Sequence, residues 1–491
     1  MYKNVRMVSH NNLLKTLKFR KKDVPRLRYG IIHSQIGFHD GVSIVIKQLE
    51  KVMVEELGIN KGNIYYLVGK AKSRGRNIHQ RKVLWHRYRT NQLMLRYFEK
   101  GYSDELREEI EQAIGEAESA VREFVEKNKI DVLIVHNSSH PVNFISSIGI
   151  SRYYKHNILE GKRTPKYILW WHDSHLERPR FRNPSDEARK YLLEGVPGRY
   201  VEYIIFINTL QFNIAQNYFL EIDKEQPGFY DSMLSNHDVI YNTTDVFINS
   251  YDELRRARLS KRVVRFLEDY DIRGLLKHRN LSLKQVLFCL QHTRIIPRKR
   301  IDFALRYCFE LLRRLRSKTS YKAIIFFVSG HSRDESKWYK RSLKRLHKKL
   351  CEEYNTKNVV MVFAEDYKKA DIKFEEIPQI IARLGGIATY FSEIEGFGNN
   401  LLEVLASGLI PVVYTYPVFV KDIARKGFKV IALKRFEVEE ESLRRTMRII
   451  RNEALRKKWV DKNLYVLKKH FQHRIMSRKL IRAIIRRRTH T

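Results

Sequence analysis

Short apolar runs alternate with longer amphipathic stretches along almost the whole chain, and this rhythm limits the possible folds more than any other feature. The runs are rich in Ile, Val, Tyr and Phe, which is typical of strands, whereas the stretches between them are typical of helices. Most runs lack polar alternation, so they belong to strands that are covered on both faces. The sequence therefore predicts an α/β protein with doubly wound parallel sheets. Its candidate strands begin at Tyr29, Ile64, Asp131, Tyr167, Tyr203, Asp238, Val286, Ala323, Val359, Ile387, Ile410 and Lys429.

The length of 491 residues exceeds what one hydrophobic core usually organises, so two domains are expected. The boundary is placed in a charged segment that has a helical pattern and no strand signals. The predicted division is a basic N-terminal extension over 1–27, a first doubly wound domain over 28–249, a helical insertion or linker over 250–280, a second doubly wound domain over 281–470, and a basic C-terminal helix over 471–491 that is expected to pack back on the first domain.

Basic residues far outnumber acidic ones, with 94 Lys and Arg against 55 Asp and Glu and a formal net charge of +39. Such a charge favours anionic partners, namely nucleic acid, an anionic lipid surface or a phosphorylated substrate, but it does not choose among them. A solvated basic surface is the plain alternative. In the C-terminal segment Met476, Leu480 and Ile484 recur every fourth position, which predicts a helix with a narrow apolar stripe. That stripe either docks on the protein or lies on a membrane surface.

The cysteines and the N-terminus favour a reducing compartment. Cys289, Cys308 and Cys351 form no close pair and have no metal-ligand spacing. The first residues lack the apolar core of a signal peptide, and no segment offers the eighteen or so apolar residues that a membrane span needs. The sequence therefore predicts a cytoplasmic protein whose contact with a membrane, if it makes one, is peripheral.

Three features of the second half lie where predicted strands end, which is where parallel sheets bind ligands. Arg294 and Lys299 follow VLFCLQ, and Gly330 lies in the turn after AIIFFVS. The third feature is SEIEGFGNN over 392–400, whose two glycines leave the main chain open just before a predicted helix. The free N–H groups of that helix suit a diphosphate or a sugar hydroxyl, and the two cations add positive charge.

Two glutamates flank this glycine turn, Glu395 and Glu403. Eight residues along a helix span about 12 Å, whereas the carboxylates of hydrolases stand about 5 to 9.5 Å apart. The spacing therefore suits two parts of one long ligand better than a hydrolytic pair. Glu403 is expected to accept hydrogen bonds from a ribose diol, and Glu395 to hold hydroxyls of a sugar beyond the diphosphate. Solvated acids on a capped helix are the alternative.

The motif SEIEGFGNNLLEVLASGLIPVV closely resembles the signature of retaining GT-B nucleotide-sugar glycosyltransferases of family 4. The segments HTRIIPRKRIDFAL, FFVSGHSRD, IYNTTDVF and HSQIGFHDGVSIVIKQL are similar to other motifs of that family and occur in its order over about residues 28 to 435. The resemblance implies two Rossmann-like domains that face each other across a cleft, with the acceptor domain first and the donor domain second. The chain departs from the pattern in its first loop, where it has only Asp40-Gly41 in place of two or three glycines, and at Thr293, where a glycine is usual.

The resemblance also implies roles for individual residues. Glu395, His172, Arg294 and Lys299 are assigned to catalysis. The residues assigned to binding of the donor are Gly41, Arg294, Lys299, Gly330, Gly396, Phe397, Gly398, Asn399, Asn400 and Glu403. Apart from the resemblance, the place of His136, Asn137 and Asp173 after strands of the first half assigns them to the acceptor. The implied donor is a nucleotide-diphosphate sugar, UDP- or GDP-linked, and no cofactor is implied.

Polar clusters after two strands of the first half leave a metal site as an alternative. They are His172, Asp173, His175 and Glu177 in one loop, and His136, Asn137 and His140 in another. Such clusters would fit a metal-dependent hydrolase, but neither has a clear ligand motif on a helix, and the family resemblance implies no metal. For His136, His140 and His175 a hydrogen-bonded loop histidine is as good an interpretation as an acceptor contact.

The predicted function is transfer of a hexose from a nucleotide-diphosphate sugar to an acceptor hydroxyl on a glycan, a glycolipid or a small polar molecule. The predicted partners are the nucleotide sugar and an acceptor sugar or lipid, with a peripheral contact to an anionic membrane. One alternative is a basic nucleic-acid-binding protein, although the sequence shows no recognisable binding module. A GT-B-fold sugar phosphorylase or epimerase is the other.

Overall fold

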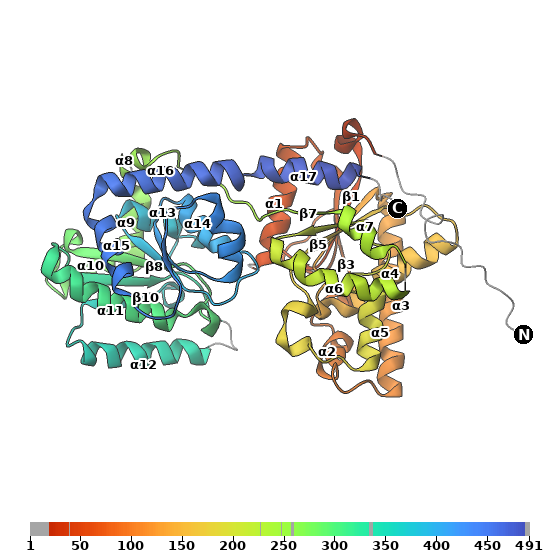
Figure 1. Cartoon of the computed structure of the whole chain (residues 1–491), viewed down its shortest axis with the longest axis horizontal. Helices are drawn as coiled ribbons and strands as arrows, with labels where there is room; N and C mark the ends of the chain where they lie inside the picture. Colours follow the sequence, from red (N-terminus) through yellow and green to blue (C-terminus); the bar gives the residue numbers. More distant parts are fainter. Residues whose placement is uncertain are drawn as a thin grey trace, which may run out of the picture. The chain divides into compact units, whose positions relative to one another are not determined.

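The fold was analysed in a computed structural model that describes residues 19–38, 40–225, 227–246, 248–256, 260–332 and 337–486. Contacts divide the chain into two compact units (Figure 1). The first unit combines residues 1–242 with residues 473–491, and the second unit spans residues 243–472. Each unit contains one parallel sheet, so the predicted fold of two Rossmann-like, doubly wound domains is confirmed.

The first unit is built on a seven-stranded sheet of order β3-β2-β1-β4-β5-β6-β7, in which every neighbouring pair is parallel. The central strands are buried on both faces, as their uninterrupted apolar runs predict. The strands are β1 (Tyr29–Ile36), β2 (Ile64–Ala71), β3 (Ile78–Gln80), β4 (Val132–His136), β5 (Lys166–Trp171), β6 (Tyr203–Phe206) and β7 (His237–Val239).

The helices of the first unit connect these strands, and the last one comes from the far end of the chain. They are α1 (Gly41–Glu55), α2 (Arg89–Arg96), α3 (Asp104–Asn128), α4 (Phe144–Leu159), α5 (Asp186–Gly195), α6 (Thr209–Glu225), α7 (Phe229–Ser235) and α17 (His473–Ile485). Short 3-10 turns shape the loops at the carboxyl ends of β4 and β5. These turns are η5 (Pro141–Asn143), η6 (His175–Glu177) and η7 (Pro179–Phe181).

The C-terminal helix α17 is an integral part of the first unit. Its apolar stripe of Met476, Leu480 and Ile484 is fully buried there. Lys479 on the same helix forms a 3.1 Å ion pair with Asp238 of β7. The alternative of a membrane-surface helix is therefore wrong, because protein already covers the apolar side chains that would have to enter the lipid. No helix in the described part of the chain is long and apolar enough to cross a membrane.

The second unit contains a six-stranded parallel sheet of order β10-β9-β8-β11-β12-β13. Its strands are β8 (Val286–Gln291), β9 (Ala323–Val328), β10 (Val359–Phe363), β11 (Ile387–Tyr390), β12 (Pro411–Tyr414) and β13 (Ile431–Leu433). Its helices are α8 (Tyr251–Arg256), α9 (Lys261–Asp269), α10 (Ile272–Lys277), α11 (Ile301–Lys318), α12 (Lys337–Glu353), α13 (Ile377–Arg383), α14 (Asn399–Ala406), α15 (Glu440–Arg451) and α16 (Glu453–His470).

The segment 250–280, predicted as an insertion or linker, contributes to the hydrophobic core of the second unit. Its helices α8, α9 and α10 bury apolar side chains in the same cluster as the sheet. The ring of Phe266 on α9 lies 5.0 Å from the ring of Phe327 on β9. The second unit begins at residue 243, before this segment, so the segment folds as part of that unit.

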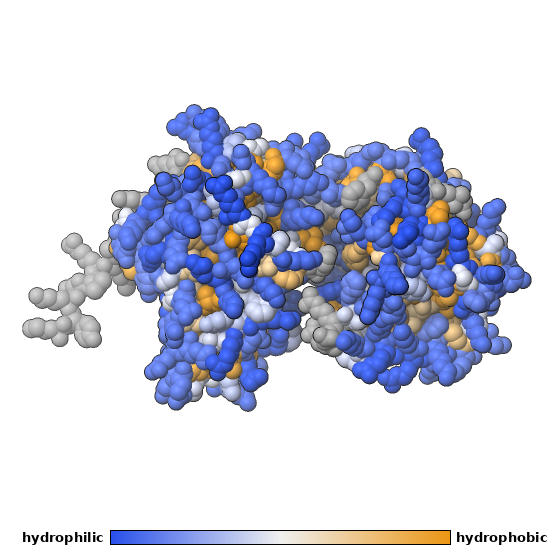
Figure 2. Space-filling model, turned by 180° about the vertical axis from the view of Figure 1, so that it is seen from behind, coloured by the Kyte–Doolittle hydropathy of each residue, from blue (hydrophilic) through white to orange (hydrophobic). Residues whose placement is uncertain are grey.

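The surface is predominantly hydrophilic on the face that Figure 2 shows, with apolar residues scattered among charged ones. This distribution agrees with the excess of basic residues and with the few large apolar side chains that are exposed. Cys289 and Cys308 are buried, Cys351 is half-buried, and all three are free thiols.

Candidate functional site

In the second unit, the loops that follow β8 and β9 touch each other through their main chains. A Cβ atom on Gly330 would lie 2.0 Å from the carbonyl oxygen of Thr293, so a side chain cannot fit at this position. Next to this contact, the N–H group of Ile295 donates a 3.1 Å hydrogen bond to the carbonyl of His331. Because β8 lies between β9 and β11 in the sheet, the loops after all three strands meet at one edge.

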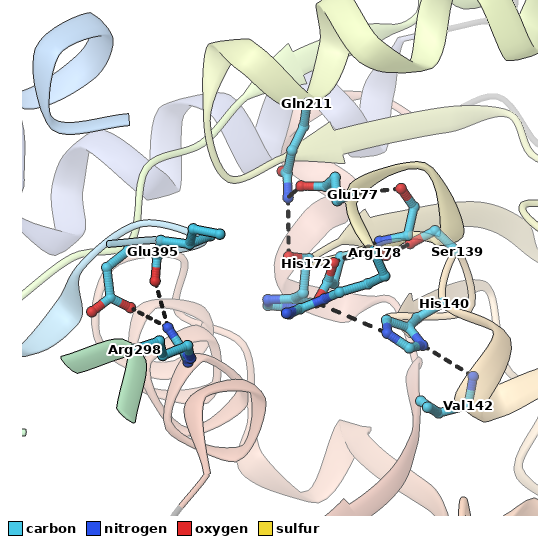
Figure 3. A network of polar contacts seen from close by, with 12 residues as sticks. Ser139, His140, Val142, His172, Glu177, Arg178, Gln211, Arg298 and Glu395 are labelled. Atoms are coloured by element: carbon cyan, nitrogen blue, oxygen red, sulfur yellow. Dashed lines mark hydrogen bonds and ion pairs between the residues drawn. The ribbon is translucent and has the colours of Figure 1, made fainter. Parts of the chain in front are cut away.

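Lys299 and Glu395 form a buried ion pair at this edge. Their side chains are only 8% and 10% exposed, and the ammonium of Lys299 donates a hydrogen bond to Oε1 of Glu395. Nη1 of a second cation, Arg298, lies 3.6 Å from Oε2 of Glu395 (Figure 3). The hydroxyl of Tyr390 donates a 2.8 Å hydrogen bond to Oε1. The structure thus joins two residues that the sequence assigned to different parts of a ligand.

Burial and neighbouring charges shift the pKa values of both partners of this pair. Burial alone would raise the pKa of Glu395, but Lys299 and Arg298 outweigh it and hold that pKa at about 2. Burial, together with the charges of Arg298 and Arg294, lowers the pKa of Lys299 to about 8 despite the attraction of Glu395. Among the described residues, Lys299 and Arg298 act on Glu395, and Arg294 lies close enough to act on Lys299, so an anion brought to this edge would meet positive charge.

The second glutamate, Glu403 on α14, is held by a histidine that the sequence analysis missed. Nε2 of His292 lies 3.0 Å from Oε2 of Glu403, and because a carboxylate only accepts, Nε2 donates. Nδ1 of His292 is 2.9 Å from the hydroxyl of Ser329. The ring is fully buried and stacks on Phe374 with a centroid distance of 4.0 Å. The side chain of Glu403 remains 28% exposed, so it can still accept hydrogen bonds from a ligand.

The sequence does contain one local signal that indicates His292 as a site residue. His292 is a polar residue directly after an apolar strand, at the sheet edge where ligands bind. Asn400, which the sequence assigned to donor binding, donates a 2.7 Å hydrogen bond from its side chain to the carbonyl of His292. The side chain of Asn400 therefore links the start of α14 to the end of β8. The main chain of Asn400 is then the part that can contact a ligand.

The glycine turn before α14 has a conformation that only glycine adopts easily. Gly398 has φ of 113°, and a Cβ atom there would lie 2.3 Å from the hydroxyl oxygen of Tyr416. That hydroxyl donates a 3.0 Å hydrogen bond to the carbonyl of Phe397. The ring of Phe397 is buried and lies 6.0 Å from the ring of Phe471, so only its main chain can face a ligand. Gly396 is exposed, and Asn399 begins α14.

In the first unit, Gly41 is the first residue of α1. Its neighbour Asp40 caps the helix by accepting hydrogen bonds from the N–H groups of Val42 and Ser43 at 3.2 and 3.0 Å. A Cβ atom on Gly41 would meet no atom of the described residues within 4 Å. Packing within the described part of the chain therefore gives no reason for glycine here, whereas a ligand that approaches the main chain would.

Buried histidines gather at the carboxyl ends of the central strands of the first unit. Nδ1 of His136 is 2.9 Å from Nε2 of His172, and Nδ1 of His33 is 3.2 Å from the carbonyl of His136. Burial lowers the pKa of His172 to about 3 and the pKa of His136 well below its usual value, so both rings are neutral at physiological pH. Gln211 donates a 3.0 Å hydrogen bond to the carbonyl of His172 (Figure 3).

The predicted acceptor residues lie in the two loops that follow β4 and β5. Asn137 adopts φ of 63°, and its side-chain oxygen is buried without a partner among the described residues. Asp173 accepts a 2.7 Å hydrogen bond from Nε of Arg178. Burial and the charge of Asp173 raise the pKa of Glu177 to about 7. Among the described residues, no group of three or more His, Cys, Asp or Glu side chains is arranged to hold a metal ion.

Comparisons with known proteins agree with the geometry of both units. No protein-family model matches the sequence. The mannosylglucosylglycerate synthase of Petrotoga mobilis is 26% identical over 427 residues, which cover 83% of this chain and 86% of that protein. The mannosylglucosylglycerate synthase of Thermotoga maritima is 24% identical over 479 residues, which cover 91% of this chain and 96% of that protein. The solved structure of the UDP-forming α,α-trehalose-phosphate synthase of Burkholderia xenovorans superposes with a TM-score of 0.60 at 10% identity. The superposition covers 94% of this chain and 100% of that structure.

The chain is a GT-B glycosyltransferase. The resemblance seen in its motifs is confirmed, and so is the prediction that it is an enzyme. The alternative of a nucleic-acid-binding protein is not favoured. Within this glycosyltransferase the structure brings Lys299, Glu395 and Glu403 to one edge of the second sheet, and His136 and His172 to one edge of the first sheet.

Proposed function

We propose that this glycosyltransferase moves a hexosyl group from a UDP- or GDP-linked sugar to a hydroxyl of a small, polar, acidic glycoside, with retention of the anomeric configuration. Donor binding is assigned to the second unit, within residues 281–470, and acceptor binding to the first, within residues 28–249. The observation that carries the donor assignment is the buried pair of Lys299 and Glu395 at the edge of the second sheet, with Arg298 beside it.

The cations would act on the leaving group. Negative charge develops on the diphosphate as the glycosidic bond breaks, so Arg294 and Lys299 bind the transition state more strongly than the ground state. A phosphate oxygen near Lys299 competes with Glu395 for the ammonium. Glu395 then has an oxygen available for a hydroxyl of the sugar. Glu403, held in place by His292, accepts from the ribose diol.

The proton of the acceptor hydroxyl is assigned to a phosphate oxygen of the donor. The buried His172 has a pKa of about 3, which makes it a weak base, so it is assigned a contact with the transferred sugar rather than the role of general base. We expect no requirement for a metal ion, as the family resemblance implies, and activity should survive treatment with EDTA.

The acceptor class is proposed from the relatives. Both curated relatives are named mannosylglucosylglycerate synthases, and the chain covers 86% and 96% of their lengths. A glycoside of glycerate is the small polar acceptor that this likeness favours. His136, Asn137 and Asp173 at the edge of the first sheet are assigned to it. Contact with an anionic membrane remains a prediction that rests on net charge alone, and sedimentation with anionic liposomes at rising salt tests it.

The proposed function is tested with a panel of UDP-, GDP- and ADP-sugars and glucosylglycerate as acceptor. We expect one donor to release its nucleoside diphosphate together with a product one hexose heavier, and the NMR coupling of the new anomeric proton to match the donor. Glu395→Gln, which keeps the size of the side chain, should lose turnover. If no donor yields product and none raises the melting temperature, the proposal is wrong.

A further inference from the structure

Three basic side chains gather around one carboxylate at the edge of the first sheet, next to the proposed acceptor residues. The loop after β5 carries Asp173, Arg178 and Arg180, and the loop after β4 carries His140. The two loops are joined by a 2.6 Å hydrogen bond from the hydroxyl of Ser139 to the carbonyl of Asp173. Figure 3 shows Arg178, Ser139 and His140 in the same region of the first unit.

Burial lowers the pKa of His140 to about 4, so that ring is neutral at physiological pH, and the charge of Glu177 also acts on Arg178. Asp173 is the carboxylate that pairs with Arg178. It accepts hydrogen bonds from Nε and Nη2 of Arg178, which leaves the N–H groups on Nη1 of that guanidinium for another acceptor. Nε2 of His140 lies 4.0 Å from Oδ2 of Asp173. Nδ1 of His140 accepts a 3.0 Å hydrogen bond from the N–H of Val142, so in the neutral ring Nε2 carries the proton and can donate.

Arg180 adds a cation that no described carboxylate neutralises by an ion pair. The residue is exposed, and its guanidinium carbon lies 4.5 Å from the centroid of the Phe181 ring. The same ring meets His140 edge-on with a centroid distance of 5.5 Å. The ring of Phe181 therefore packs against both the exposed Arg180 and the buried His140. Burial and the charge of Arg178 lower the pKa of Arg180, which shows that the two guanidinium groups repel each other.

Unpaired polar atoms lie at the same sheet edge, and they suit the hydroxyls of a sugar. Nε2 of His136 and Oδ1 of Asn137 are buried and have no hydrogen-bond partner among the described residues. Residue 136 pairs with residue 170 in the sheet, so these atoms come from the strand beside the one that leads to Asp173. A ligand with hydroxyls and one negative charge would match both the unpaired atoms and the guanidinium groups of Arg178 and Arg180.

We propose that Arg180 and Arg178, with His140, form a subsite that binds the carboxylate of the acceptor. This inference rests on the proposed function and adds the residues that select an acidic acceptor. A planar guanidinium binds a carboxylate through two parallel N–H groups, which fixes the direction of the acceptor as well as its charge. A phosphate would meet the same cations, and the relatives favour the carboxylate because their names contain glycerate.

The test compares three acceptors with the same donor: glucosylglycerate, its neutral analogue glucosylglycerol, and glucose 6-phosphate. In the wild-type protein we expect the highest kcat/KM for the carboxylate. In Arg180→Ala the ratio of kcat/KM between glucosylglycerate and glucosylglycerol should fall by about ten- to one-hundred-fold, the value of one hydrogen bond to a charged group. The loss should appear in KM, and Arg180→Lys should restore part of it.

Arg182→Ala is the matched control, because Arg182 is also an exposed arginine of this segment but is not among the groups that act on His140. It should keep the wild-type ratio. Equal use of the acidic and neutral glycosides by the wild-type protein would overturn the inference and leave the proposed function intact. A preference for glucose 6-phosphate, or an equal fall of the ratio in Arg182→Ala, would overturn it too. Failure of all three acceptors, with no stabilisation by any donor, would overturn the proposed function itself.

Discussion

The buried positive charge of Lys299 is expected to lower the stability of the folded protein, although the same charge is proposed to bind the donor. The Lys299 pKa of about 8 lies below the usual 10.5, because burial and neighbouring cations oppose the charged form more than Glu395 favours it. At about 1.4 kcal/mol per pKa unit, the protonated ammonium costs about 3 kcal/mol at neutral pH. Lys299→Met removes the charge and keeps a similar shape, so it should stabilise the protein by about 1–3 kcal/mol. Donor affinity should fall about ten- to one-hundred-fold, because one hydrogen bond to a phosphate is lost.

The assay is denaturant unfolding of wild type and variant between pH 7 and pH 10.5. Between pH 8 and 10.5 the unfolded wild-type chain holds a proton at Lys299 that the folded chain has lost, so wild-type stability rises with pH in this window. The advantage of Lys299→Met should therefore be largest at pH 7 and vanish near pH 10.5.

Lys340→Met is the matched control for this experiment. The side chain of Lys340 is 15% exposed and forms a 2.7 Å ion pair with Glu365. Burial lowers its pKa, but Asp366 and Glu365 outweigh burial and raise it, so loss of this charge should destabilise the protein. If Lys299→Met also destabilises at pH 7, or if its advantage does not change with pH, the buried charge of Lys299 does not lower the stability and the reasoning fails.

Three further predictions concern single side chains. Gly330→Ala should destabilise the protein by more than about 2 kcal/mol in thermal unfolding, because its Cβ would overlap the carbonyl of Thr293, whereas Gly41→Ala should keep the stability and lower donor affinity. Glu403→Gln should raise the Kd of the donor about tenfold in calorimetry with little change in kcat, since the ribose is remote from the reacting carbon. His172→Ala should lower kcat, and because the pKa of His172 is about 3, the wild-type kcat should not fall between pH 7 and pH 5.5 through protonation of this ring.

Most of the fold could be predicted from the apolar runs. Strands that are buried on both faces are apolar at almost every position, so each one is visible in the sequence as a continuous apolar run. The strand β3 was missed, since it is a three-residue edge strand with half-buried side chains and has no such run. Helices α8 to α10 were read as a linker because their charged faces dominate the sequence. Only their contacts with the sheet show that their apolar faces belong to a core.

The candidate site could be predicted in part. The spacing of Glu395 and Glu403 and the glycines between them are local features, so the sequence places them correctly on one turn and one helix. The pairing of Lys299 with Glu395 joins residues 96 positions apart, and no local pattern contains that information. The place of His292 directly after an apolar strand could suggest a site residue, but its pairing with Glu403 depends on a contact with α14 that forms only when β8 and β11 pair.

The most direct test of the account compares binding of nucleoside diphosphates and monophosphates by calorimetry. The central claim is that cations at the edge of the second sheet bind the diphosphate of the donor. Wild-type protein should bind UDP or GDP at least tenfold more tightly than UMP or GMP, and the double variant Arg294→Ala, Lys299→Met should lose that preference while it still binds the monophosphate. A double variant that keeps the full preference for the diphosphate would contradict the claim.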